Sequence, residues 1–294
     1  MELRIKELTK TYPNGVKALQ DVSLTIKNGM FGLLGPNGAG KSTLMRTLAT
    51  LQLPDSGTAE LDQLDILREK TEVRKILGYL PQEFGSYPRT SVSAMLNHIA
   101  LLKGVTQRRE RRELVGAMLH RVNLYQHRFK SVTGFSGGMK QRFGIAQALM
   151  CNPRLLIVDE PTAGLDPSER NRFYNLLAEV GENTIVILST HIVQDVRELC
   201  SQMAILDQGH VVYAGQPREA LMDLEGRIWE CSVPMSQLDE FQRQYHVLST
   251  KLVAGKPLVH VLSDQEPGEG FTSVRPELED VFFSKTGTML TTKK

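Results

Sequence analysis

The sequence predicts an α/β fold built around a mostly parallel sheet. Three stretches carry this prediction: a glycine-rich loop at 35–43, an apolar run at 155–160 that ends in two carboxylates, and an apolar run at 184–190 that His191 follows. Short apolar runs of this kind are typical of strands buried on both faces of a parallel sheet. Sites on such sheets lie at the carboxyl ends of the strands, so the polar residues after these runs should meet at one edge.

The loop at 35–43 matches GxxxxGK[ST], the phosphate-binding loop. An apolar run at 29–34 precedes it and a helically spaced apolar run at 43–49 follows, so the loop joins a strand to a helix. That turn directs backbone amides and the helix N-terminus at one point, where phosphate would bind. A glycine-rich turn with a solvated lysine is the alternative, which both flanking elements disfavour. The expected nucleotide-binding residues here are Gly35, Pro36, Asn37, Gly38, Ala39, Gly40, Lys41, Ser42 and Thr43.

Three side chains of this loop receive separate roles. Lys41 should place its charge at the β- and γ-phosphates, Ser42 should offer its hydroxyl to Mg²⁺, and Thr43 should lie near the α-phosphate. Gly35, Gly38 and Gly40 should let the backbone curl close to phosphate oxygens without a Cβ in the way.

Composition bounds the remaining possibilities. The 294 residues can form one large domain and a small one, and 35 basic against 33 acidic residues leave a net charge of +2. No general attraction to nucleic acid or acidic lipid follows, so we expect no nucleic-acid partner. Three scattered cysteines are typical of reduced thiols in the cytosol. We see no signal-peptide core and no apolar run near the roughly 20 residues that span a bilayer, so any membrane role should require another chain.

The N-terminal stretches at 2–8 and 18–26 alternate in polarity and predict two antiparallel strands joined by a turn at 11–15. Tyr12 stands in that turn, where its ring could stack on adenine. Stacking of this kind is worth roughly 1–3 kcal/mol per base. A tyrosine that only packs in the turn is the alternative.

A short strand at 77–80 breaks at Pro81, and Gln82 follows it directly. An amide at this place can bond a metal-bound water or an oxygen near the γ-phosphate, although many glutamines are simply solvated. Phe84, Tyr87 and Pro88 then form an aromatic loop. Helices are expected at 91–102 and 107–124, and the arginines of the second alternate with glutamates, which favours a solvated face over a basic patch.

The stretch at 135–150 predicts a capped helix. Ser136 supplies the cap, two glycines open the turn, and an apolar stripe follows at helical spacing. By itself this is either a second anion-binding helix start or an ordinary exposed one.

The run at 155–160 ends in Asp159 and Glu160, the Walker B pattern. Asp159 should hold the Mg²⁺ shell, and Glu160 should orient and deprotonate the attacking water. A turn at 163–167 leads into a helix with Pro167 suited to its first position. His191, one residue past a strand beside these carboxylates, should contact the γ-phosphate rather than merely pack.

Taken in order, GPNGAGKST, Gln82, FSGGM, LLIVDE, AGLD and His191 resemble the nucleotide-binding domain of ABC transporters over roughly residues 1–225. The resemblance implies a P-loop NTPase of the ABC ATPase type, with a mostly parallel core sheet, an antiparallel β subdomain and an inserted helical subdomain at about 85–150. It also implies ATP hydrolysis with ATP and Mg²⁺. Tyr12 is then the adenine-stacking aromatic. The implied catalytic residues are Lys41, Gln82, Glu160 and His191, and the implied metal residues are Ser42, Gln82 and Asp159, the last through water.

The resemblance further implies that two ATPase subunits act together as a pair. Ser136, Gly137 and Gly138 would contact the γ-phosphate of ATP bound to a second copy or a homologous ATPase subunit, and Asp166 would lie in the loop that crosses the dimer interface. Phe135 and Met139 depart from the usual leucine and glutamine of this signature, which should affect rate and dimer affinity rather than function.

Residues 226–294 lie beyond this resemblance and predict a small α+β appendage. We expect a strand at 227–233, a helix at 236–245, two strands within 251–262 and a last helix at 276–287. The segment resembles the C-terminal appendage of ATPases that serve ABC-2-type exporters, with the LEDVFFSKTG ending as its most specific part. A purely stabilising cap is the alternative.

The sequence thus predicts the ATPase subunit of an exporter. It would lie peripherally on the cytoplasmic face of the cell membrane and power a separate integral-membrane permease, whose contact we expect at Phe84 and Tyr87. The alternative is a soluble ABC ATPase that acts on ribosomes, in DNA repair or in cluster assembly. Such proteins usually carry paired nucleotide domains, a long coiled-coil insertion or zinc ligands, none of which occurs in this sequence.

Overall fold

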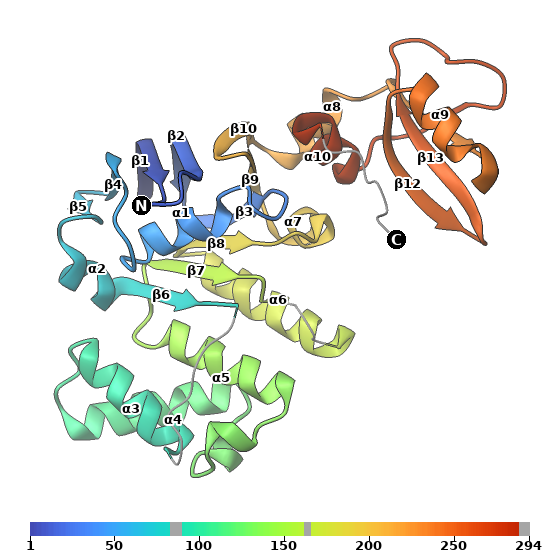
Figure 1. Cartoon of the computed structure of the whole chain (residues 1–294). Coiled ribbons are helices and arrows are strands. Elements are labelled where there is room, and N and C mark those ends of the chain that lie inside the picture. The colour runs from blue at the N-terminus through green and yellow to red at the C-terminus, as the bar shows by residue number, and fades with distance from the viewer. Residues whose placement is uncertain (83–89, 162–165, 288–294) are drawn as a thin grey trace.

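A computed structural model describes residues 1–82, 90–161 and 166–287, whose strands form three sheets (Figure 1). The central sheet has six strands in the order β10-β9-β3-β8-β7-β6, parallel throughout except for β10. Its strands are β3 (Gly29–Leu34), β6 (Leu77–Leu80), β7 (Leu155–Asp159), β8 (Ile185–Ser189), β9 (Gln202–Asp207) and β10 (His210–Gly215). Every residue of β7 and β8 is buried, as the apolar runs predicted.

A second, antiparallel sheet covers α1 (Lys41–Leu48), the helix that follows the phosphate-binding loop. Its order is β2-β1-β4-β5. The strands are β1 (Glu2–Thr11), β2 (Lys17–Lys27), β4 (Ser56–Leu61) and β5 (Leu64–Asp65). Leu3, Ile5 and Leu24 point inward and share one hydrophobic cluster with Leu44 and Leu48 of α1. The predicted antiparallel β subdomain is confirmed, and it fixes the helix start that the loop leads into.

The helical lobe lies at the β6 end of the central sheet (Figure 1). It follows α2 (Lys70–Ile76) and β6 in the chain. The lobe contains α3 (Val92–Leu102), α4 (Arg108–Arg121), the 3-10 turns η1 (Tyr125–His127) and η2 (Val132–Gly134), and α5 (Gly137–Leu149). Close packing joins α5 to β6, because a Cβ on Gly78 would stand 2.2 Å from the carbonyl oxygen of Ala148. The limits of about 85 and 150 for this subdomain stay a prediction.

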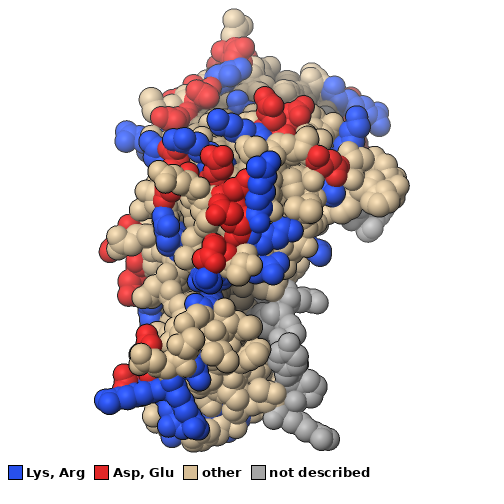
Figure 2. Space-filling model, turned by 90° about the vertical axis from the view of Figure 1, so that its left-hand side faces the viewer, with Lys and Arg blue, Asp and Glu red and all other residues tan. Residues whose placement is uncertain are grey.

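The charged residues of α4 form a solvated face. Arg109 and Glu113 are exposed and paired at 3.0 Å, and Arg111 donates to the carbonyl oxygens of Val105 and Thr106. Figure 2 shows basic and acidic side chains interspersed over the upper body of the molecule, with basic side chains prominent at the helical lobe below.

The helices α6 (Pro167–Gly181), α7 (Val193–Leu199) and α8 (Pro217–Met222) complete the main body. Pro167 occupies the first turn of α6, as predicted. Gly32 of β3 lets α7 approach, since a Cβ there would stand 2.7 Å from a methyl carbon of Val196. Phe173 and Leu177 of α6 pack into the same hydrophobic cluster as Val186 and Leu188 of β8.

The C-terminal segment folds into a third sheet, in the order β12-β13-β11-β14. Its elements are β11 (Ile228–Ser232), η3 (Met235–Gln237), α9 (Leu238–Gln244), β12 (Val247–Val253), β13 (Lys256–Leu262) and β14 (Thr272–Ser273). The sequence placed the first strand of the hairpin from 251, whereas β12 begins at Val247, because Val247 and Leu248 are buried by packing. The helix expected at 236–245 begins as a 3-10 turn and becomes α-helical at Leu238.

The last helix, α10 (Leu278–Thr286), packs back on the main body. It contacts α7, α8, β9 and β10 of the main body as well as β12 of the third sheet, and Leu278 and Val281 join the hydrophobic cluster that contains Met203 and Ile205 of β9 (Figure 1). It ends at Gly287, as predicted, in the left-handed conformation with φ +61°. The division of the chain at 225 and 226 stays a prediction, but this helix belongs by its packing to the main body's core.

Some predictions fall outside the described residues. These are the aromatic loop with Phe84, Tyr87 and Pro88, the turn residues Ala163, Gly164 and Leu165, and the tail at 288–294. Searching the described ranges finds no helix with both the length and the apolarity to cross a membrane.

Candidate nucleotide-binding and catalytic site

A hollow of about 740 Å³ opens where β3, β6, β7 and β8 end. We call it the nucleotide hollow. Segments far apart in the chain meet there: the phosphate-binding loop, the β1–β2 turn, three strand ends and α10. Its lining residues are Tyr12, Val16, Ala18, Gly35, Pro36, Asn37, Gly38, Ala39, Gly40, Lys41, Ser42, Thr43, Gln82, Glu160, His191, Phe282 and Phe283.

The loop holds Lys41 at its centre. The side chain is 6% exposed, and its Nζ donates to the carbonyl oxygens of Gly35 at 2.6 Å and Pro36 at 3.1 Å. Burial lowers the pKa of Lys41 from its usual value, against the attraction of Glu160 and Asp159. The loop therefore holds a cation where phosphate would lie.

Two glycines of the loop are required by neighbouring strands. Gly40 has φ +106°, and a Cβ there would stand 2.2 Å from the carbonyl oxygen of Ala18. A Cβ on Gly35 would stand 2.4 Å from the carbonyl oxygen of Leu206. The sequence assigned these glycines to phosphate approach, but the packing of β2 and β9 alone already excludes a side chain at both positions.

Glu160 is clamped between the two polar residues predicted beside it. Its Oε2 accepts from Nε2 of Gln82 at 3.1 Å, and its Oε1 lies 3.2 Å from Nδ1 of His191. Its backbone has φ +47°, and its N–H donates to Ser189 of β8 at 2.9 Å. The left-handed residue turns the chain at the end of β7 and aims the carboxylate into the hollow.

Asp159 lies behind this clamp. It ends β7, is 8% exposed and does not line the hollow itself. Burial raises the pKa of Asp159, and the Glu160 carboxylate reinforces this effect. Ser42, Gln82 and Asp159 offer hydroxyl, amide and carboxylate oxygens, the hard donors that Mg²⁺ prefers alongside nucleotide phosphates. The donor set fits a Mg²⁺ ion that arrives with its nucleotide.

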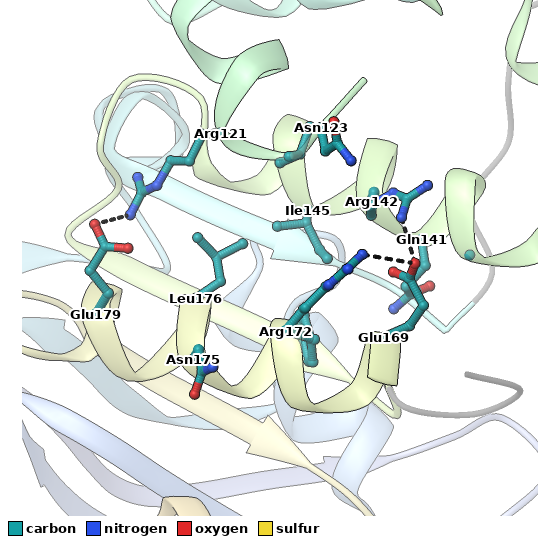
Figure 3. Close-up of a pocket in the computed structure, with 13 residues that line it drawn as sticks. Arg121, Asn123, Gln141, Arg142, Ile145, Glu169, Arg172, Asn175, Leu176 and Glu179 are labelled. Carbon is teal, nitrogen blue, oxygen red and sulfur yellow. Dashed lines mark hydrogen bonds and ion pairs between the residues drawn. The ribbon is translucent and has the colours of Figure 1, made fainter. Parts of the chain in front are cut away.

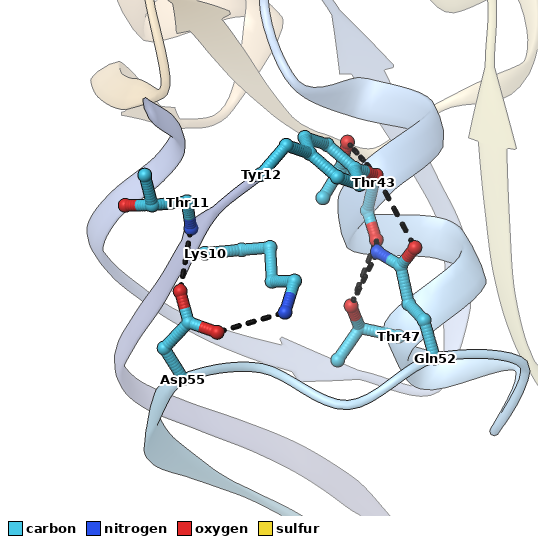
Figure 4. A network of polar contacts seen from close by, with 7 residues as sticks. All are labelled: Lys10, Thr11, Tyr12, Thr43, Thr47, Gln52 and Asp55. Atoms are coloured by element: carbon cyan, nitrogen blue, oxygen red, sulfur yellow. Dashed lines mark hydrogen bonds and ion pairs between the residues drawn. The ribbon is translucent and has the colours of Figure 1, made fainter. Parts of the chain in front are cut away.

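Tyr12 is held in place by its hydroxyl (Figure 4). That oxygen lies 3.2 Å from Thr43 Oγ1 and donates to Gln52 Oε1 at 3.2 Å. Gln52 in turn donates to the Thr43 carbonyl at 2.9 Å and to Thr47 Oγ1 at 3.1 Å. The network ties the β1–β2 turn to α1, so the half-buried ring has a defined position at the hollow. The sequence did not indicate that Gln52 takes part in this hydrogen-bond network.

Ser136, Gly137 and Gly138 lie apart from the nucleotide hollow of their own chain. Ser136 caps α5 by accepting from the Met139 N–H at 3.4 Å, and both Ser136 and Gly137 are exposed. Asp166 caps α6 with two 2.9 Å hydrogen bonds from the N–H groups of Ser168 and Glu169, and the bond from Glu169 contributes most to lowering the pKa of Asp166. These groups are available at the surface and do not complete the site of their own chain.

Four lining residues were not predicted: Val16, Ala18, Phe282 and Phe283. Val16 and Ala18 belong to the hairpin that the alternating polarity of its strands predicted. Their closeness to Tyr12 in the sequence was a weak indication that they line the hollow. Phe282 and Phe283 lie in the LEDVFF stretch, which the sequence marked only as specific to a family branch. Nothing in their spacing relates them to a loop near the other end of the chain.

A second hollow, the α5–α6 cleft, has a volume of about 350 Å³ and lies between the helical lobe and the main body (Figure 3). Ile145 and Phe173 form an apolar floor. Arg142 and Arg172 both approach Glu169, at 2.6 Å and 3.7 Å, and Arg121 pairs with Glu179 at 2.9 Å. The Arg142–Glu169 and Arg121–Glu179 pairs join α5 and the end of α4 to α6, whereas Arg172–Glu169 lies within α6.

Comparison with known proteins extends these observations. The family profile described as ABC transporter matches residues 19–163. The uncharacterized ABC transporter ATP-binding protein YxlF of Bacillus subtilis is 37% identical over 232 residues, 79% of this chain and 76% of that protein. The chain belongs to the ABC transporter ATP-binding family.

Two further ABC relatives differ in the function that their names state. The probable multidrug ABC transporter ATP-binding protein YbhF of Escherichia coli is 30% identical over 302 residues, 97% of this chain but only 52% of YbhF. The phosphonates import ATP-binding protein PhnC of Chromohalobacter salexigens is 37% identical over 229 residues, 73% of this chain and 84% of that protein.

Solved ABC structures agree with the fold. The structure of an ATP-binding subunit of an ABC transporter superposes with a TM-score of 0.70 at 27% identity, over 76% of this chain and 93% of that one. The dimeric bacterial ABC transporter cassette MJ0796 gives a TM-score of 0.67 at 27% identity, over 73% and 98%. The predicted ABC ATPase fold is confirmed. The chain is an ATP-binding subunit of a transporter and an ATPase.

Proposed function

We propose that this ABC subunit hydrolyses ATP at a site shared between two chains and so powers a separate permease of the exporter type. The observation that carries the proposal is the division of the site residues. The nucleotide hollow holds the phosphate-binding loop with Gln82, Glu160 and His191, whereas Ser136 and Gly137 are exposed outside it. A second chain placed head to tail would bring its Ser136 to this loop, and twofold symmetry would complete two sites at once.

Within the hollow, each residue has a distinct part. Lys41 and the loop amides bind the phosphates, and Tyr12 carries the base. Glu160 accepts a proton from the attacking water, while Gln82 and His191 keep its carboxylate pointed into the hollow. When bound with the nucleotide through Ser42, Gln82 and Asp159, Mg²⁺ would neutralise charge on the phosphoryl oxygens.

Dimerisation has support from the solved relative MJ0796, whose cassette is described as dimeric. In our chain, Ser136 caps α5 and the exposed Gly137 follows it, and Asp166 caps α6. The start of α5 offers N–H groups and a positive dipole end to a partner's phosphate, whereas the start of α6 presents the Asp166 carboxylate. We propose that Ser136, Gly137 and Gly138 contact the partner's nucleotide and that Asp166 lies at the interface.

The exporter assignment rests on the C-terminal segment. The match to YbhF, a probable multidrug protein by its name, covers 97% of this chain and therefore extends through nearly all of residues 226–294. The match to the importer subunit PhnC covers 73%, about the length of residues 1–225 alone. We propose that the chain lies on the cytoplasmic face of the cell membrane through its permease.

Replacing Glu160 by Gln tests the shared site. The variant should bind ATP, lose turnover by about a hundredfold or more because its general base is gone, and accumulate as a dimer with Mg-ATP. Light scattering after size-exclusion chromatography measures the dimer, and phosphate release measures turnover. Glu182→Gln, at an exposed carboxylate after α6, is the matched control and should change neither.

A Glu160→Gln chain that stays monomeric with Mg-ATP, both alone and in a complex with the permease, would contradict the shared site. For the exporter, the test is transport by the reconstituted complex. ATP-dependent uptake into the cell, rather than efflux, would contradict that part of the proposal.

A further inference from the structure

Two aromatic rings from the last helix line the nucleotide hollow. Phe282 and Phe283 of α10 are half-buried, and their centroids lie 5.3 Å apart with planes at 79°. They reach the hollow from the C-terminal segment, whereas the loop and Tyr12 come from the first 43 residues. Large apolar side chains at the mouth of a site that binds phosphate need an explanation, since phosphate offers them nothing.

The order of the central sheet shows which end of the nucleotide these rings face. The phosphate-binding loop follows β3, and β8, β7 and β6 lie on one side of it, ending at His191, Glu160 and Gln82. On the other side lie β9 and β10, against which α10 packs. The catalytic residues occupy one flank of the loop, so the γ-phosphate belongs there. The opposite flank is left for the nucleoside.

Tyr12 lies on that same opposite flank. Its hairpin is joined to the turn between β9 and β10, because Gln20 N–H donates to the Gly209 carbonyl at 2.8 Å. Gly209 N–H donates in turn to Ala39 of the loop at 3.0 Å. Tyr12, Val16 and the two phenylalanines thus gather beside β9 and β10. Their side chains are aromatic or apolar, in contrast to the charged flank around Glu160.

We propose that Phe282 and Phe283 form a second wall of the base-binding site, so that the adenine of ATP binds against α10 as well as Tyr12. The proposal rests on the nucleotide site described above. A planar heterocycle is the occupant that suits this flank, because its π-faces stack on aromatic rings and cover apolar surface at once. Tyr12 can stack on one face of the base, and the rings of Phe282 and Phe283 can contact the remaining surface of the base.

The wall is rigidly held. Val281, between Leu278 and the two rings, is fully buried, and Lys285 Nζ lies 5.8 Å from the Tyr213 ring centroid of β10. At the other end of α10, Asp280 lies 2.8 Å from Nδ1 of His260 in β13. The helix thus connects the third sheet to the nucleotide hollow. The affinity for the base would therefore depend on how the C-terminal segment packs against the main body.

The test compares the binding of ATP, which carries a base, with the binding of inorganic tripolyphosphate, which has none. In the full chain, the double variant Phe282→Leu, Phe283→Leu keeps apolar volume but removes the rings. It should bind ATP about tenfold more weakly and inorganic tripolyphosphate as tightly as the parent does. Phe241→Leu is the matched control, because Phe241 is a half-buried aromatic of the separate cluster with Tyr245 and Phe271, and it should change neither affinity.

A single Phe283→Trp variant provides an independent reading if the double variant folds poorly. Its added indole should change emission with ATP and not with tripolyphosphate, above the background of Trp229, the one tryptophan of the chain. Unchanged ATP affinity in a folded double variant, together with an indole that ATP does not perturb, would overturn the proposal. Equal weakening of ATP and tripolyphosphate would also overturn it, since α10 would then only shape the hollow. If the parent binds neither ligand, the nucleotide site itself fails.

Discussion

The nucleotide hollow and the α5–α6 cleft both contain basic and acidic side chains but differ in how these charges are partnered. In the hollow, the hydrogen bonds of Lys41 within the described part of the chain go only to carbonyl oxygens of its own loop, and Glu160 is held by a neutral amide and a histidine. In the cleft, Glu169 faces two arginines and Glu179 faces a third (Figure 3). The first arrangement leaves charge available to a ligand. The second neutralises it within the chain, so the cleft acts as a joint between the helical lobe and the main body.

The largest effect should follow from Lys41→Ala. This change removes the cation that the loop carbonyls hold where phosphate would lie. Because charge-assisted hydrogen bonds to phosphate are worth about 1.5–3 kcal/mol each, ATP affinity should fall by roughly a hundredfold or more. Titration calorimetry measures it. An unchanged thermal midpoint would show that the fold survives, and retained ATP affinity would place the phosphates elsewhere.

The second largest effect should distinguish the α5–α6 cleft from the nucleotide hollow. Glu169→Gln leaves Arg142 without its carboxylate partner, and the two side chains are only 23% and 19% exposed. We expect the free energy of unfolding to fall by about 2 kcal/mol, since a partly buried charge then loses its partner. Urea denaturation measures the loss, while ATP affinity of the monomer should stay unchanged. A large loss of ATP affinity with normal stability would make the cleft part of the binding site.

A smaller effect should come from pH, at the bond between His260 and Asp280 that joins β13 to α10. Hydrogen bonding with Asp280 raises the pKa of His260 above its usual 6.5, with a further contribution from Glu230 and opposition from burial and Lys251. A raised pKa in the fold means that protonation stabilises it. This stabilisation is complete below the usual pKa and disappears as pH rises through the raised value.

Denaturation of the C-terminal segment should therefore become easier as pH rises above 6.5, followed by the emission of Trp229, which lies on β11 beside β13. His260→Gln should remove this dependence on pH. A parent protein whose Trp229 transition does not move with pH over this window would contradict the role of the His260–Asp280 bond in seating α10.

The smallest effect is expected at the outer ion pair of the cleft. Glu179 is 66% exposed and Arg121 32%, so water screens the pair. Glu179→Gln should change the free energy of unfolding by no more than about 0.5 kcal/mol. Compared in the same urea titration with Glu169→Gln, it shows whether burial or mere pairing decides the strength of the joint. An equal loss in both variants would mean that burial plays no part.

Local patterns in the sequence were sufficient for much of this fold. The apolar runs at 155–160 and 184–190 predicted two fully buried strands, because a strand covered on both faces must be apolar throughout. Ser136 was predicted as a helix cap and Pro167 at the first position of a helix, and both predictions are confirmed. Such features depend on residues close in the chain, so short stretches of sequence are enough to predict them.

The sequence by itself determined the phosphate-binding loop and the strands that end at Gln82, Glu160 and His191, since backbone geometry and burial periodicity act over a few residues. The order of its motifs added the resemblance to the ABC ATPase fold. Only the tertiary structure decided that Gln82 and His191 clamp Glu160, that Ser136 stays outside its own nucleotide hollow, and that Phe282 and Phe283 return to line it. These contacts join segments separated by dozens to hundreds of residues. Their free energy comes from packing and burial that exist only once the sheets and helices have assembled.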